Sequence, residues 1–124
     1  RRAMSSLLAV DGLTAVFVAS DVVAFGAIAA IREAGLRAPA DISVVGFDEI
    51  PLRRFFDPPL TTTQLPAFDL GRAAGAALLD RIHGRTVVPR TVLPTELVIR
   101  SSTGPPHGRR GRSPDRPAPP AAPM

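Results

Sequence analysis

A short apolar run, from Ile42 to Phe47, constrains the fold of this chain more than any other feature. The run holds Ile, Val, Val and Phe between Pro39 and Asp48, which is typical of a buried β-strand. Apolar residues fall on both of its faces, which fits a parallel strand covered on both sides. An acid at the carboxyl end of such a strand lies where open α/β sheets bind ligands. Asp48 is therefore either a ligand-facing carboxylate or an ordinary acidic loop residue.

A second strand and a helix precede this run and complete a strand–helix–strand unit. Residues 14–19 have the pattern of another buried strand, and residues 22–34 that of an amphipathic helix. Strands joined in this way are parallel, so Ser20, Asp21 and Asp48 are expected at one edge of the sheet. Polar side chains that converge there orient a small polar ligand in many proteins. The alternative for Asp21 is that it caps the helix.

The remaining elements are predicted from shorter patterns. We expect the end of a helix over 1–10, a strand over 60–65, a helix over 67–83 and a last strand over 96–100. Phe55 and Phe56 lie in an irregular loop, where paired aromatic residues are either core residues or interface anchors. Gly71 and Gly75 lie four residues apart and would let helix 67–83 sit close on a sheet.

The composition changes at Gly104. Residues 104–124 hold seven of the 14 Pro residues, so we expect one domain over 1–103 and a disordered Pro/Arg-rich tail over 104–124. Four Arg against one Asp give this tail +3 of the total charge of +4. The rest of the chain is nearly neutral and lacks the basic footprint of a nucleic-acid-binding domain.

Motifs for catalysis are missing from the sequence. There is no Cys, and the two His residues have no metal-ligand spacing with each other or with the acids. We find no nucleophile elbow, phosphate-binding loop or dinucleotide fingerprint. These observations predict a protein that is not an enzyme and needs no cofactor. No apolar run approaches the roughly 18 residues of a membrane span, so we expect no membrane insertion.

Five fragments of the chain follow the order and spacing of one known family. They are residues 14–21, 24–27, 33–49, 58–62 and 93–103. Together they resemble the C-terminal part of the lactose-repressor (LacI/GalR) family of bacterial transcription regulators. The resemblance implies a periplasmic-binding-protein-like (type I) α/β sensor fold, of which this chain holds the C-terminal portion. It also implies a cytoplasmic homodimer whose affinity for operator DNA shifts when a sugar or nucleoside-like effector binds.

The resemblance also assigns roles to individual residues. Asp48 matches an acid that hydrogen-bonds ligand hydroxyls, which suits a carboxylate with two acceptor oxygens. Ser20 matches a position that is more often Asn, and Leu65 one that is often Gln at the rim of the cleft. With Asp21, these residues are the predicted ligand-binding set. The predicted subunit contact comprises Ala24, Ala27, Ile28, Phe55 and Phe56.

Parts of that family have no counterpart here. The chain opens within a helical pattern and lacks a DNA-binding helix-turn-helix, so we expect a truncated regulator that reaches operator DNA only through a missing N-terminal domain. The isolated fragment is expected to be marginally stable or to self-associate. Two alternatives stay open: the sugar-binding protein of an ABC transporter, which shares the fold, and a non-functional gene fragment.

Overall fold

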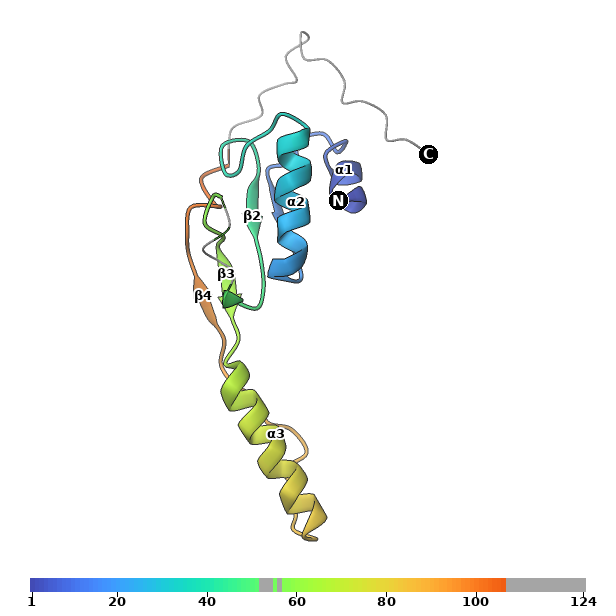
Figure 1. Ribbon diagram of the computed structural model, residues 1–124, viewed down its shortest axis with the longest axis vertical. Helices are drawn as coiled ribbons and strands as arrows, with labels where there is room; N and C mark the ends of the chain where they lie inside the picture. The colour runs from blue at the N-terminus through green and yellow to red at the C-terminus, as the bar shows by residue number, and fades with distance from the viewer. Residues whose placement is uncertain (52–54, 56, 107–124) are drawn as a thin grey trace.

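A computed structural model of the protein describes residues 1–51, 55 and 57–106 (Figure 1). Each helix and strand predicted from the sequence is present, with bounds that differ by a few residues. Phe56 lies outside the described residues, and so does the part of the predicted tail that follows Pro106. The elements are α1 (Arg2–Leu7), β1 (Ala15–Phe17), α2 (Asp21–Glu33), β2 (Ser43–Val45), β3 (Thr62–Gln64), α3 (Ala67–Ile82) and β4 (Glu96–Val98).

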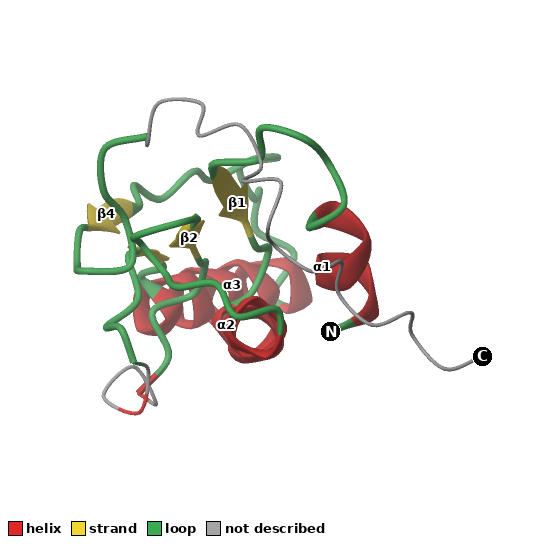
Figure 2. Cartoon of the chain, turned by 90° about the horizontal axis from the view of Figure 1, so that it is seen from above, coloured by secondary structure: helices red, strands yellow, loops and turns green. Residues whose placement is uncertain are grey.

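The predicted strand–helix–strand unit forms the centre of the body, by which we mean the described chain without α3 and the loop that returns from it to β4. Strands β1 and β2 are parallel, with Val16 opposite Val44 in the register. Helix α2 connects them and lies along one side of both strands (Figure 2). Apolar side chains at helical spacing on α2 pack against those of the strands and of Leu60. The buried residues of this layer are Ala24, Ala27, Ile28, Ala30, Ile31, Ile42 and Val44. The α/β fold predicted from the sequence is confirmed.

Two later segments of the chain, around Thr61 and Ser102, extend the hydrogen bonding of β2. The amide of Val44 donates to the carbonyl of Ser102, and the amide of Gly46 donates to the carbonyl of Thr61, both at 2.8 Å. Ser102 is fully buried, and its hydroxyl donates to the carbonyl of Val44 at 2.6 Å and accepts the amide of Thr61 at 2.7 Å. Beyond these contacts β3 and β4 form an antiparallel pair. The chain therefore leaves and re-enters the body through adjacent strands.

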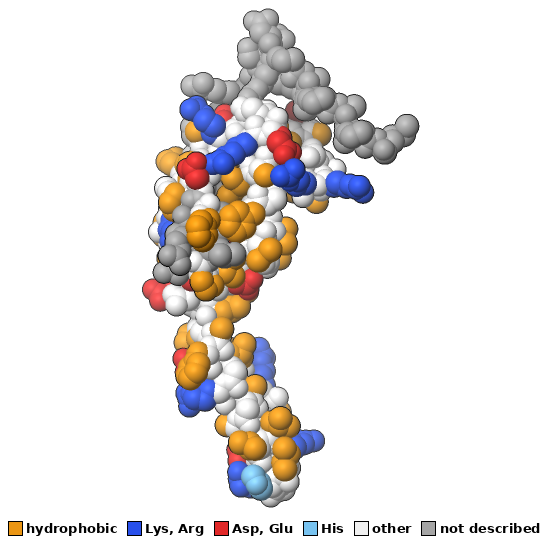
Figure 3. Space-filling view, in the orientation of Figure 1, with side chains coloured by type: hydrophobic (Ala, Val, Ile, Leu, Met, Phe, Trp, Pro, Cys, Tyr) orange, Lys and Arg blue, Asp and Glu red, His pale blue; other side chains and the backbone are white. Residues whose placement is uncertain are grey.

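Helix α3 stands away from the body, at the far end of β3 and β4 (Figure 1). None of its residues is buried, and Phe68 is 83% exposed and Ile82 68% exposed. Apolar side chains therefore lie open along this helix (Figure 3). A Cβ added at Gly71 or Gly75 would have no atom of a neighbouring described segment within 4 Å. The predicted helix is present, but its apolar stripe has no packing surface in the described part of this chain.

None of the helices in the described part of the chain is long and apolar enough to cross a membrane.

Candidate functional site

The carboxyl ends of β1 and β2 meet at one edge of the sheet, as the strand–helix–strand pattern predicts. The amide of Asp21, just after β1, donates to the carbonyl of Phe47, just after β2, at 2.8 Å. A bridge between Asp48 and Gln64 brings the end of β3 to the same edge. This edge therefore gathers all four residues that the sequence predicted to bind a ligand: Ser20, Asp21, Asp48 and Leu65.

Asp48 lies in a turn with an unusual backbone conformation. Its φ is 114° and that of Glu49 is 57°. Each such residue costs about 1–3 kcal/mol and persists only where its surroundings hold it in place. The amide of Asp48 donates to the carbonyl of Thr63 at 3.0 Å. The residue is partly exposed, and its carboxylate has no hydrogen bond or ion pair to the described residues. Both oxygens can therefore accept hydrogen bonds from a ligand.

Asp21 turns its carboxylate inward. The residue is fully buried. One carboxylate oxygen accepts the hydroxyl of Thr62 at 2.6 Å, and the other accepts the amide of Ile50 at 3.1 Å. Gly46 makes room for this carboxylate, because an added Cβ would collide with Asp21 Oδ1 and lie 2.7 Å from Leu60 Cδ2. Asp21 thus joins the turn after β2 to the start of β3.

The expected capping role of this segment takes a different form. Ser20 is the N-cap residue of α2, and its side chain makes no capping hydrogen bond. Asp21 is the first residue of the helix, and its negative charge there is favourable because it faces the positive end of the helix dipole. Ser20 and Leu65 are both partly exposed at the edge. Their contact with a ligand stays a prediction, as does that of Asp21.

The charged pair Glu49–Arg100 was not foreseen as part of this site. The two guanidinium nitrogens donate to the two Glu49 oxygens at 2.6 and 2.8 Å. The Arg100 side chain is only 20% exposed and that of Glu49 only 9%. The hydrogen bond to Glu49 raises the pKa of Arg100 above its ordinary value. Both residues stand next to recognisable features, since Glu49 follows Asp48 and Arg100 ends the last apolar run, but nothing in the sequence pairs them.

The predicted subunit-contact residues divide into two groups. Ala24, Ala27 and Ile28 are 0%, 5% and 6% exposed, because they face the core of the chain itself. Phe55 is 66% exposed and Phe56 lies outside the described residues. On α2, the exposed apolar side chains are instead those of Val22 and Val23. Helical spacing identified the apolar stripe correctly, but this stripe is the one that packs inward.

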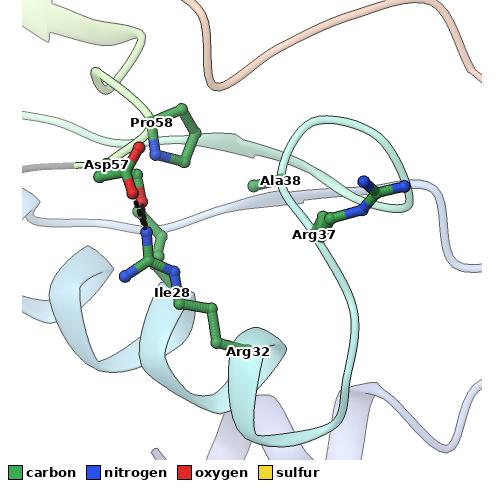
Figure 4. Close-up of a pocket in the computed structure, with 6 residues that line it drawn as sticks. All are labelled: Ile28, Arg32, Arg37, Ala38, Asp57 and Pro58. Carbon is green, nitrogen blue, oxygen red and sulfur yellow. Dashed lines mark hydrogen bonds and ion pairs between the residues drawn. The ribbon is translucent and has the colours of Figure 1, made fainter.

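A hollow of about 430 Å³ lies near the far end of α2, away from the carboxyl edge of the strands. Its lining comprises Ile28, Arg32, Arg37, Ala38, Asp57 and Pro58 (Figure 4). Arg32 pairs with Asp57 at 2.7 Å, whereas the guanidinium of Arg37 points away from that pair. The charged groups do not converge on the hollow, so it is a weaker candidate than the edge that carries Asp48.

In the described part of the chain, no group of three or more His, Cys, Asp or Glu residues could hold a metal ion.

Comparison with known proteins places this geometry in a family. Residues 1–103 match the family described as periplasmic binding protein-like domain. The HTH-type transcriptional regulator MalR of Streptomyces coelicolor is 50% identical over 112 residues, which are 89% of this chain and 32% of that protein.

Two solved structures are also similar. The lac repressor dimer bound to operator and the anti-inducer ONPF is 38% identical, with a TM-score of 0.75 over 82% of this chain and 36% of that one. A LacI family transcriptional regulator from Enterococcus faecalis with bound ribose is 35% identical, with a TM-score of 0.77 over 84% of this chain and 39% of that one.

The chain belongs to the periplasmic binding protein-like domain family. More narrowly, it corresponds to part of the effector-binding domain of LacI-family transcription regulators, which confirms the resemblance identified from the sequence. It spans about a third of the length of the curated relatives that it matches. These relatives are regulators and not enzymes, in line with the prediction from the missing catalytic motifs.

Proposed function

We propose that this chain binds the small-molecule effector of a dimeric LacI-type transcription regulator that acts in the cytoplasm. A part of the protein outside residues 1–124 binds the operator DNA. The effector is a sugar or a nucleoside-like molecule, and its binding shifts the affinity for DNA. For such a shift, the effector must bind two arrangements of the protein unequally.

The Asp48 carboxylate is the observation that supports effector binding at the edge of the sheet. It has no hydrogen-bond or ion-pair partner among the described residues, and a strained turn holds it. A carboxylate can accept hydrogen bonds from two adjacent hydroxyl groups, an arrangement that sugars and ribosides offer. Ser20 would add a shorter polar contact, and Leu65 an apolar one. A related structure that contains ribose agrees with this class of ligand.

The subunit contact is proposed for the exposed apolar side chains near the predicted region. Ala24, Ala27 and Ile28 are buried in their own core and leave very little surface for a second subunit. Val22, Val23 and Phe55 are each more than half exposed. Large apolar side chains of this kind are common in subunit interfaces. A related repressor is a dimer, which supports the same assembly here.

The experiment uses the full-length protein, meaning residues 1–124 with any sequence that adjoins them in the gene. Calorimetric titration with ribose, a set of mono- and disaccharides and a set of nucleosides should find a ligand. The Asp48→Asn variant should weaken its binding by at least about tenfold, because charge-assisted hydrogen bonds contribute about 1.5–3 kcal/mol.

The matched control is Asp11→Asn, which removes an exposed acid from a turn before β1. This variant should bind the ligand as the native protein does. The ligand should also change the affinity of the native protein for operator DNA. If no compound in these sets binds, or if the bound compound leaves the DNA affinity unchanged, the proposed function is wrong.

A further inference from the structure

The turn that carries Asp48 is anchored at three consecutive residues. The Asp48 amide donates to a backbone carbonyl of β3 at 3.0 Å. The Glu49 carboxylate pairs with Arg100, and the Ile50 amide donates to the Asp21 carboxylate at 3.1 Å. Both Asp48 and Glu49 have positive φ, a conformation that persists only where the surroundings hold it. These anchors therefore set the direction of the Asp48 side chain.

Arg100 joins this turn to the segment that leads into β3. One guanidinium nitrogen donates both to Glu49 Oε2 and to the Leu60 carbonyl, each at 2.8 Å. The other nitrogen donates to Glu49 Oε1 at 2.6 Å. The backbone amide of Arg100 donates to the hydroxyl of Thr61 at 2.9 Å. Arg100 is thus fixed to the chain just before β3 through both its backbone and its side chain.

We propose that Arg100 is a positioning residue for effector binding: through Glu49, it holds the Asp48 carboxylate in the direction that a sugar or nucleoside hydroxyl requires. This inference rests on the proposed function of the edge. Arg100 does not touch the ligand. Because it lies just after β4 and binds the segment just before β3, it also ties Asp48 to the two strands through which the chain leaves and re-enters the body.

The planar guanidinium is essential to this role. Its fork reaches two carboxylate oxygens and one carbonyl at once, which an ammonium on a flexible stem cannot reproduce. Substitution by Lys would keep the positive charge beside Glu49 but lose the fixed geometry. Substitution by Gln would remove the positive charge as well. Arg100→Lys therefore tests the geometry of the contact apart from its charge, and the local pattern of amide exchange separates positioning from stability.

The first test measures hydrogen–deuterium exchange of backbone amides in the full-length protein, with no ligand. Arg100→Gln should speed the exchange of the Asp48 and Ile50 amides by about tenfold or more, given the strength of hydrogen bonds to charged groups. The amides of Val44 and Gly46, which bond to Ser102 and Thr61, should change much less. Equal acceleration at all four amides would show a role in stability alone and would overturn the proposal.

The matched control is Arg85→Gln, which removes the exposed ion pair between Arg85, just after α3, and Asp80 in its last turn. This variant makes the same change of charge. The hydrogen–deuterium exchange rates of the Asp48 and Ile50 amides should remain those of the native protein. Arg100→Lys is the second variant, and it serves where Arg100→Gln does not fold. It should accelerate the same two amides, and native exchange rates in Arg100→Lys would contradict the positioning role.

The second test measures affinity for the compound that binds the native protein. Arg100→Lys should weaken binding by about tenfold, measured at a temperature at which the variant remains folded. Unchanged affinity in this variant, together with loss of binding in Asp48→Asn, would refute the role of Arg100 and leave the proposed function standing. If no compound binds the native protein, the proposed function fails, and the exchange experiment alone decides whether Arg100 positions the turn.

Discussion

Helices α2 and α3 have similar amphipathic sequences but very different surroundings. Helix α2 buries six residues: Asp21, Ala24, Ala27, Ile28, Ala30 and Ile31. Helix α3 is longer and buries none. Its apolar residues recur at helical spacing as those of α2 do, yet they remain open. The difference lies in the surface available to each helix, because the strands that α2 covers are present and α3 extends past the end of β3 and β4 (Figure 1).

This contrast separates the presence of an apolar helix face from the burial of that face, which a sequence pattern does not distinguish. The pattern predicts that a helix has an apolar face, and here it does so correctly for both helices. Burial of that face depends on residues far away in the chain, and it provides most of the stability of a helix in a protein. In the described part of this chain, packing against the strands therefore stabilises α2, while α3 relies on its local helix propensity.

The largest expected difference is between two apolar truncations. Ile31→Ala, in the core under α2, should lower the free energy of unfolding of residues 1–124 by about 3–4 kcal/mol, because it leaves a cavity around a fully buried side chain. Leu79→Ala, at a site 55% exposed on α3, should change it by less than about 0.5 kcal/mol. Urea denaturation followed by circular dichroism gives both values.

The same pair of variants in the full-length protein sharpens the comparison. If a further part of the protein covers α3, Leu79→Ala will become costly there while Ile31→Ala keeps its value. A large cost for Leu79→Ala in residues 1–124 alone would contradict the exposed position of α3. Self-association of residues 1–124 through the apolar face of α3 would give the same result, and sedimentation velocity at several concentrations distinguishes it from burial within one chain.

A medium effect is expected from paired acidic residues. Asp21→Ala should cost about 2–3 kcal/mol, because the Thr62 hydroxyl and the Ile50 amide lose a buried acceptor. Asp69→Ala, in the first turn of α3, removes an exposed ion pair with Arg72 and a favourable charge at the helix start. It should cost no more than about 0.5 kcal/mol. Equal costs, measured by urea denaturation, would mean that the Asp21 carboxylate does not join the turn to β3.

Local patterns in the sequence were enough to predict the elements and the edge. The alternation of apolar strands with a capped helix predicts a parallel pair, and parallel strands place Ser20 and Asp48 at one edge. The structure shows that arrangement, with a hydrogen bond between Asp21 and Phe47. These predictions succeed because each depends on residues within about one strand–helix–strand unit, roughly 30 residues.

The contacts that shape the edge could not be predicted in the same way. Arg100 lies 51 positions from Glu49, and Thr62 lies 41 positions from Asp21. The Glu49–Arg100 pair depends on how the chain returns to the body after α3, and the Asp21–Thr62 bond depends on how β3 reaches the start of α2. One sequence carries no periodic signal for either pairing. The same limit explains the subunit contact. Spacing identifies Ala24, Ala27 and Ile28 as one face of α2 without indicating whether that face meets its own strands or a second subunit.

The smallest expected effect comes from Gly75 on α3. In residues 1–124, Gly75→Ala should stabilise α3 by about 0.5–1 kcal/mol, because Ala has the higher helix propensity and nothing in the described residues lies within 4 Å of the added Cβ. Gly46→Ala should have the opposite sign, since its Cβ would collide with the Asp21 carboxylate.

Helix content during a urea titration measures the effect at Gly75. A loss of helix in residues 1–124 would show that a neighbouring segment already occupies the space beside this glycine. In the full-length protein the sign of the same substitution carries further information. If Gly75 lets α3 approach a sheet closely, as its spacing from Gly71 indicates, the added methyl group will destabilise the longer protein while it stabilises the shorter one. A gain of stability in both would mean that any surface covering α3 lies on another face of the helix.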